Sequence, residues 1–237
     1  MFYYERVSKK MNAVVFYSNT DQSASIAEYF SKSLGYPLVN ITQARTINYE
    51  NLVLVFPVYC QNIPYTVRTF LKNIKVKHLT AIATYGKMCC GNVLYEIQKN
   101  FRMNIVAGAY VPSKHSYLDN DRAFRDFEQL TPIVEKVKNP SEIQVPKLYK
   151  NPLANLFPTI RSRLGVKIFK NSTCTNCGTC TECCNFKAIK SGVVNKNCIR
   201  CLKCVSSCPH NALKAKFRLP LRLYLKKNRT NKLIIYV

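Results

Sequence analysis

The residues whose types and spacing could do chemistry are eight cysteines between Cys174 and Cys208. They form two runs, each spaced C-x2-C-x2-C-x3-C, and the second run repeats the first at an offset of 24 residues. Three thiolates on one tight loop can face three irons of an iron–sulfur cube, whereas the fourth iron needs a ligand from another direction. The sister repeat can supply that ligand, so the pattern predicts two cubane clusters with crossed ligands.

This stretch resembles the two-cluster 4Fe–4S ferredoxins over about residues 170–215. The family's proline follows Cys208, but Asn185 replaces it in the first run. Cys183 adjoins Cys184 and either could be the ligand, although the spacing favours Cys184. Structural zinc is the alternative, because C-x2-C pairs also bind zinc, but zinc sites usually separate their pairs by about a dozen residues. The resemblance implies two ligand sets: Cys174, Cys177, Cys180 and Cys208, and Cys198, Cys201, Cys204 and Cys184.

Composition and charge set broad limits on the class of protein. The 237 residues suffice for one ordinary domain and a small one, and no run of eighteen apolar residues or secretory signal occurs. We therefore expect a soluble, cytoplasmic protein in a reducing compartment. Lysine and arginine total 36 against 12 acidic residues, and residues 139–237 hold 19 of the basic and only 2 of the acidic residues. Such a surface favours acidic partners (redox proteins, nucleic acid or anionic lipid), unless it is merely a solvated lysine-rich surface.

The first half of the chain has the alternating pattern of an α/β protein. Apolar runs predict five strands, and residues with helical spacing follow four of them. This order predicts a doubly wound parallel five-stranded sheet, whose ligands bind beyond the carboxyl ends of the strands. The predicted strands are residues 12–17, 37–41, 52–55, 80–84 and 105–111, and the predicted helices are residues 24–34, 64–71, 92–101 and 122–137.

Three loops of this half resemble the flavin-contacting loops of flavodoxins: FYSNTDQSASIAE, FPVYCQNIPYTVRTFL and ATYGKMCCG. The segment AGAYVPSKHSYL resembles the part that follows the fifth strand. The whole chain thus resembles flavodoxin–ferredoxin fusion proteins of anaerobic microbes. Two departures stand in the first loop, since Asp21 replaces a glycine and Gln22 replaces a common asparagine.

The flavodoxin resemblance implies an FMN site with residues from all three loops. Hydroxyls and free N–H groups suit its phosphate, and aromatic faces suit its flat ring. The phosphate would be held by Ser18, Asn19, Thr20, Gln22 and Ser23. The ring would be lined on one side by Pro57, Val58 and Tyr59, and on the other by Thr84, Tyr85, Gly86 and Gly91.

We predict a flavodoxin-like domain over residues 11–138, a linker over 139–170, a small α+β ferredoxin domain over 171–215 and a basic tail over 216–237. Residues 1–10 are expected to be a loose extension, or Met11 the natural start. In the linker, residues 159–170 could form a basic amphipathic segment that docks the two domains, or one that lies on a membrane surface. The tail could add a strand to the ferredoxin domain or present a basic face.

The leading functional hypothesis is an electron-transfer protein with two 4Fe–4S clusters, which exchange electrons with FMN and with an acidic redox partner. A flavin-dependent oxidoreductase acting on a small molecule is the second hypothesis, although no general acid or base stands out. A basic nucleic-acid-binding protein with structural clusters is the third, although the chain has no clear recognition motif.

Overall fold

Five parallel strands form the larger part of the protein, in the order β2-β1-β3-β4-β5. The computed structural model describes residues 10–45, 47–118, 122–156, 158–227 and 230–237, so the predictions about residues 1–9 lie outside the described residues. The strand order is the flavodoxin-like one, in which the chain reverses direction across the sheet between β1 and β3. The five strands are β1 (Met11–Phe16), β2 (Leu38–Asn40), β3 (Asn48–Pro57), β4 (Lys75–Tyr85) and β5 (Ile105–Pro112).

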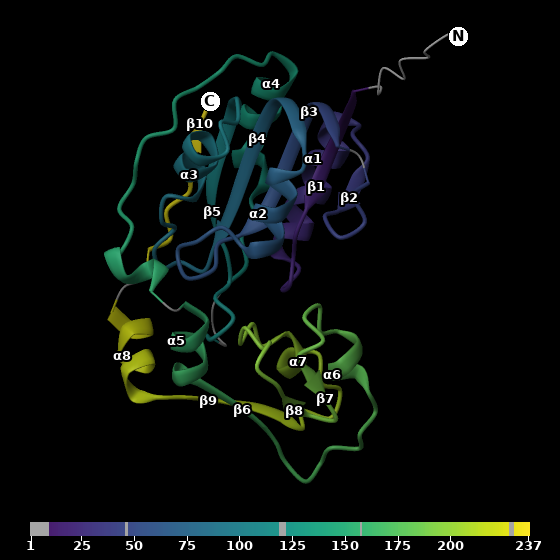
Figure 1. Cartoon of the computed structure of the whole chain (residues 1–237), viewed down its shortest axis with the longest axis vertical. Helices are drawn as coiled ribbons and strands as arrows, with labels where there is room; N and C mark the ends of the chain where they lie inside the picture. Colours follow the sequence, from purple (N-terminus) through teal and green to yellow (C-terminus); the bar gives the residue numbers. More distant parts are fainter. Residues whose placement is uncertain (1–9, 46, 119–121, 157, 228–229) are drawn as a thin grey trace, which may run out of the picture.

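Helices cover both faces of the sheet (Figure 1). One face packs Val15, Leu54 and Ala83 against α2 (Tyr65–Lys72) and α3 (Val93–Asn100). The other face packs Val14, Val53 and Ile82 against α1 (Gln22–Leu34) and α4 (Thr131–Lys138), the latter preceded by the 3-10 turn η1 (Phe127–Leu130). Because both faces are buried, the strands read as continuous apolar runs. The predicted doubly wound fold is confirmed.

The C-terminal segment adds a sixth strand to this sheet. β10 (Ile234–Tyr236) pairs antiparallel with β5, and the hydroxyl of Tyr85 donates to the carbonyl of Lys232 at 2.6 Å and accepts from its N–H at 3.1 Å. The sheet is therefore larger than the five strands expected. The two expectations for the tail were a strand added to the ferredoxin domain or a basic face, whereas its last strand joins the sheet of the other domain.

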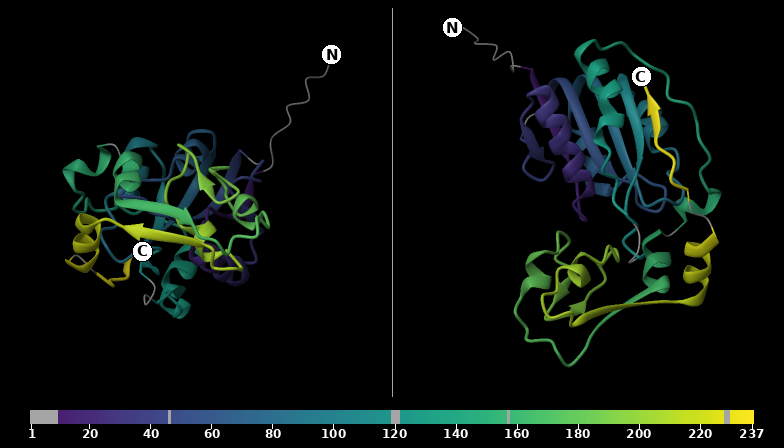
Figure 2. Two further views of the ribbon diagram at one scale, coloured as in Figure 1. Left: turned by 90° about the horizontal axis from the view of Figure 1, so that it is seen from below. Right: turned by 180° about the vertical axis from the view of Figure 1, so that it is seen from behind.

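A small α+β unit lies beyond the carboxyl ends of the parallel strands (Figures 1 and 2). Its main feature is an antiparallel ribbon of β6 and β9, whose inner residues Val166, Ile168 and Leu213 share a core with Cys198 and Cys204. β6 lies inside the segment predicted as a linker. The elements of this half are η2 (Pro152–Asn155), α5 (Pro158–Gly165), β6 (Val166–Lys170), α6 (Thr179–Glu182), β7 (Ile189–Lys190), β8 (Val193–Val194), α7 (Lys203–Ser206), β9 (Leu213–Phe217) and α8 (Leu219–Lys227).

Candidate functional site

The eight cysteines of the repeats line two separate cavities in the small unit. The space outside protein atoms, open solvent included, is about 360 Å³ at one cavity and about 390 Å³ at the other. Each cavity takes three cysteines from one repeat and the fourth from the other, which is the crossed arrangement expected from the sequence. The first is lined by Cys174, Cys177, Cys180 and Cys208, and the second by Cys184, Cys198, Cys201 and Cys204, with Cys183 beside them.

The backbone repeats along with the cysteines. Positive φ angles recur at the same 24-residue offset: Asn176 and Arg200 (55° and 61°), Gly178 and Leu202 (86° and 63°), and Lys187 and Asn211 (47° and 48°). The left-handed conformation is uncommon for side chains other than glycine, asparagine and aspartate. Its recurrence at six positions, three of them Arg, Leu and Lys, shows that the loops are held in one shape. That shape turns three sulfurs of each run toward one cavity.

Hydrogen bonds to sulfur distinguish Cys184 from Cys183. The N–H of Ala188 donates to Cys184 Sγ at 3.3 Å, and the N–H of Ala212 donates to Cys208 Sγ at the same distance. The two bonds are equivalent under the repeat, and amide donors stabilise a ligating sulfur. By contrast, Cys183 Sγ donates to the carbonyl of Cys180 at 3.6 Å. Cys184, and not Cys183, thus has the same hydrogen bond to its sulfur as Cys208.

The protonation of the cysteines bears on cluster assembly. Burial raises the pKa of the Cys204 thiol to about 12, so this side chain is protonated at neutral pH before iron binds. Cys177, by contrast, has its pKa lowered by the hydroxyl of Thr179, 3.4 Å away. Only thiolates ligate iron, so binding of a cluster by Cys204 would require the release of its proton.

The loop predicted to bind a phosphate precedes α1. Asp21 has a φ of 64°, so it takes the left-handed backbone shape for which glycine is usual. Ser23 is buried and its hydroxyl lies 2.8 Å from that of Thr84, whereas the amide of Gln22 exchanges hydrogen bonds with the backbone of Phe124. The side chains of Ser23 and Gln22, predicted to hold a phosphate, are thus bonded within the protein. A phosphate would use the backbone N–H groups of the helix start, together with the half-buried Ser18 and the exposed Thr20.

Asn19 is buried at the centre of a polar network. Its amide donates to the hydroxyl of Tyr17 at 3.2 Å and to that of Tyr59 at 2.5 Å. Burial raises the pKa of Tyr59 well above its ordinary value, so this hydroxyl stays neutral. Asn19 also accepts a hydrogen bond of 2.6 Å from Asn185, which follows Cys184 in the small unit. The phosphate loop is therefore joined directly to the first cysteine repeat.

The residues predicted to line a flavin ring divide into two groups. Pro57, Val58 and Tyr59 are half-buried where β3 ends, so they stand at the loop edge of the sheet. Thr84 and Tyr85 are buried, and the side chain of Tyr85 lies in the core, held by Lys232.

The two predicted glycines lie at close approaches between loops. A Cβ atom on Gly91, whose φ is 66°, would meet the carbonyl oxygen of Gln61 at 2.5 Å. A Cβ atom on Gly86 would likewise meet His115 at 2.7 Å. These close approaches hold the predicted flavin loops against their neighbours. Tyr59, at the end of β3, is the half-buried aromatic side chain among the predicted ring residues.

Two contacts that the sequence did not indicate join the two parts of the molecule. Tyr117 donates its hydroxyl to the carbonyl of Arg200 at 2.9 Å, and its ring packs on Phe217. Asn185 forms the bond to Asn19, and Asn19 itself lines the second cysteine cavity. The only sequence signal was the absence of the usual proline at Asn185. Together these contacts place the second cavity against the phosphate loop.

Comparison with known proteins agrees with the cysteine half. Residues 193–214 match the family described as 4Fe–4S binding domain. No curated protein matches the chain.

In the described residues, no group of three or more His, Cys, Asp or Glu side chains is arranged to hold a metal ion, and no helix is long and apolar enough to cross a membrane.

Solved structures that resemble the larger half have low identity. A protein from Bacteroides uniformis described as a flavoprotein is 13% identical, with a TM-score of 0.42 over 54% of this chain and 99% of its own. An archaeal flavodoxin is 14% identical, with a TM-score of 0.39 over 54% and 98%. Rubredoxin oxygen:oxidoreductase from Desulfovibrio gigas is 17% identical, with a TM-score of 0.43 over 54% of this chain and 35% of that enzyme. The strand order of the sheet, not these likenesses, defines the flavodoxin-like fold.

Proposed function

We propose that this chain is an electron-transfer protein, a flavodoxin–ferredoxin fusion that carries two 4Fe–4S clusters and FMN. The crossed gathering of two four-cysteine sets around separate cavities is the observation that carries the proposal. One cluster takes Cys174, Cys177, Cys180 and Cys208, and the other takes Cys184, Cys198, Cys201 and Cys204. Each cluster passes one electron at a time.

The contact between the two halves gives these electrons a short route. Asn19 lies both in the phosphate loop and on the wall of the second cavity, so a cluster there lies beside the flavin loops. The residues that hold FMN are those of the phosphate loop, with Tyr59 beside the ring. When bound, FMN supplies the exchange between one- and two-electron chemistry. The basic surface of the small unit suits an acidic redox protein as partner.

The test is the content of iron, sulfide, zinc and flavin in protein purified and reconstituted without oxygen. We expect about eight irons and one FMN per chain. Eight irons without flavin would reject the FMN part alone and leave a two-cluster carrier. Zinc in place of iron would reject electron transfer altogether.

Asp21 should weaken the binding of FMN, because its exposed carboxylate stands at the phosphate loop. In the Asp21→Asn variant the charge is lost, and asparagine tolerates the left-handed backbone. Two unit charges about 4 Å apart in water interact by about 1 kcal/mol, so we expect FMN to bind roughly fivefold more tightly. Flavin fluorescence titration measures this affinity.

Glu28→Gln is the matched control, because it removes the same charge from an exposed position farther along α1. Equal affinities of the Asp21→Asn variant, the control and the unmodified protein would show that the FMN phosphate does not lie at this loop.

A further inference from the structure

Two short helices leave neighbouring ends of the β6–β9 ribbon. α5 runs into β6 and α8 follows β9, and the N–H of Arg218 donates to the carbonyl of Gly165 at 3.0 Å. A Cβ atom on Gly165 would lie 3.0 Å from Cδ2 of Leu221, so the absence of a side chain there lets the helices touch. The two helices lie side by side at one corner of the molecule (Figures 1 and 2).

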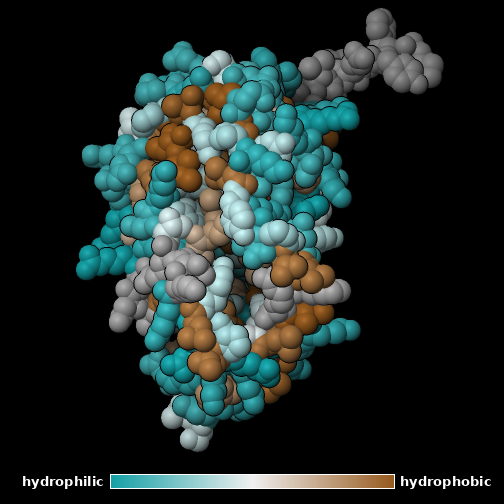
Figure 3. Space-filling view, turned by 90° about the vertical axis from the view of Figure 1, so that its left-hand side faces the viewer, coloured by the Kyte–Doolittle hydropathy of each residue, from teal (hydrophilic) through white to brown (hydrophobic). Residues whose placement is uncertain are grey.

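The outer sides of these helices carry large apolar residues that the described parts of the chain leave exposed. Leu219 and Leu223 are 63% and 57% exposed, and Ile160 and Leu164 are 49% and 56% exposed. Each pair is spaced i,i+4 and so shares one helix face. Leu225, on the inner side of α8, is only 5% exposed. We call the four exposed residues the α5–α8 apolar face. Seen from this side, brown hydrophobic surface alternates with teal in the lower half of the molecule (Figure 3).

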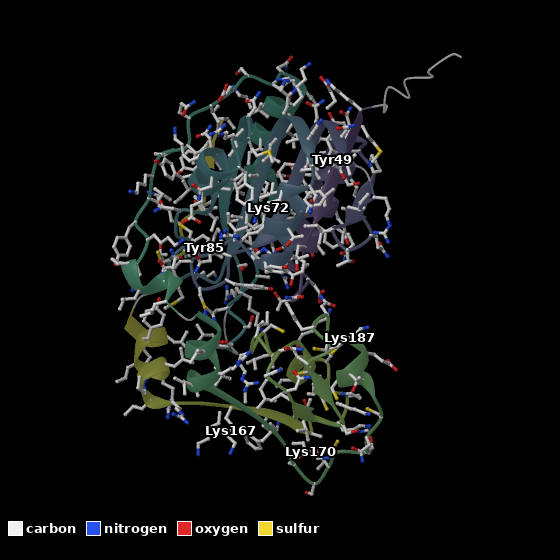
Figure 4. All side chains as sticks on the ribbon, viewed as in Figure 1. Tyr49, Lys72, Tyr85, Lys167, Lys170 and Lys187 are labelled. Carbon is white, nitrogen blue, oxygen red and sulfur yellow. The ribbon has the colours of Figure 1, made fainter. Side chains whose placement is uncertain are left out.

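Basic residues surround this apolar face. Arg218, Arg222 and Lys226 are exposed on and beside α8. On the ribbon, Lys167 pairs with Lys216 in register, and Lys167 and Lys170 lie on the edge of the small unit farthest from the sheet (Figure 4). Cross-strand pairs of like charge are destabilising, so this pair of lysines lowers the stability of the ribbon. The sequence has no acidic residue from 183 to 237, nor from 143 to 181, to neutralise it.

We propose that the α5–α8 apolar face binds the surface of an anionic lipid bilayer. Leu219, Leu223, Ile160 and Leu164 enter the boundary between headgroups and acyl chains, and Arg218, Arg222 and Lys226 contact the lipid phosphates. A bilayer offers anionic headgroups and hydrocarbon within one continuous surface, and exposed leucines flanked by unpaired arginine and lysine match both. This attachment goes beyond electron transfer and does not depend on it.

The experiment is co-sedimentation of the reconstituted holoprotein with vesicles of phosphatidylglycerol and phosphatidylcholine, or of phosphatidylcholine alone. We expect binding to the anionic vesicles at least about tenfold tighter than to the neutral ones, weakening as salt rises. The double variant Leu219→Ser/Leu223→Ser should lose at least about tenfold of that affinity, because it loses its insertion into the acyl region. Arg222→Gln/Lys226→Gln should lose a similar factor, and iron content reports whether each variant is folded.

Two matched control variants test whether vesicle binding depends on this face or on any exposed apolar side chain or positive charge. Ile47→Ser/Val193→Ser removes two other exposed aliphatic side chains, which are 60% and 66% exposed. Lys32→Gln/Lys72→Gln removes two exposed charges from the larger half. Both controls should bind nearly as the unmodified protein does. No binding to anionic vesicles, equal binding to both vesicles, or equal losses in controls and variants would overturn the proposal. Binding of an acidic protein through this face without vesicle binding would also overturn it.

Discussion

The Cys184→Ala variant is expected to hold about four irons per chain instead of about eight. Cys184 is the fourth cysteine of the second cavity, and its sulfur accepts the N–H of Ala188 as a ligating thiolate would. Without it, one iron of that cluster lacks a protein ligand, and the cube loses iron or falls apart. The first cavity keeps all four of its cysteines. Iron and sulfide analysis, with electron paramagnetic resonance of the reduced protein, measures the loss.

Cys183→Ala is the matched control, because it removes the adjacent thiol from the same turn. The Cys183 sulfur donates to the carbonyl of Cys180, so its loss removes one weak hydrogen bond, and we expect about eight irons to remain. The reverse result, with iron lost from Cys183→Ala and kept by Cys184→Ala, would make Cys183 the ligand. Loss of iron from neither variant would contradict the crossed ligand sets.

The elements that the sequence predicted well are those whose signal is local. The buried runs of β1, β3, β4 and β5 are apolar because both faces of the sheet are covered, and their order fixed the fold class. The cysteine spacing predicted two clusters, which stays a prediction, and the repeat also gives the two loops the same backbone shape. The helix expected over residues 122–137 was less accurate, since the described part begins with the 3-10 turn η1 and the α-helix covers Thr131–Lys138.

What the sequence could not predict depends on contacts between distant segments. The flavodoxin resemblance assigns Tyr85 to a flavin ring, but Lys232, 147 residues away, holds its hydroxyl. Nothing near Asn185 indicates that it reaches Asn19, apart from the missing proline. Residues 159–170 are expected to dock the two domains or to lie on a membrane surface, and Ile160 and Leu164 within this segment are exposed. Tertiary packing determines the surroundings of each of these side chains, and local sequence patterns carry no information about such packing.

Removal of residues 230–237 should lower the free energy of unfolding of the sheet domain by about 4 kcal/mol. Ile234, Ile235 and Tyr236 are half-buried in their pairing with β5, and each contributes about 1 kcal/mol. Tyr85 would also lose both bonds to Lys232, which leaves a buried hydroxyl unpaired at a cost of about 1 kcal/mol. Since domains have only about 5–15 kcal/mol of stability, the loss should move the urea midpoint clearly.

Tyr85→Phe is the matched control, because it removes the hydroxyl while β10 stays. We expect it to cost about 1 kcal/mol, well below the truncation. Hydrogen exchange of the amides at Gly108 and Tyr110, which pair with Tyr236 and Ile234, should accelerate in the truncated chain and change little in Tyr85→Phe. An unchanged urea midpoint and unchanged exchange after truncation would mean that β10 does not pair with β5 in solution. Because the tail leaves the small unit after α8 and its last strand pairs with β5, a stable β10 gives the cysteine-bearing unit a second connection to the flavodoxin-like domain, held by strand pairing. That second connection would restrict how far the second cysteine cavity can move from Asn19 and the phosphate loop.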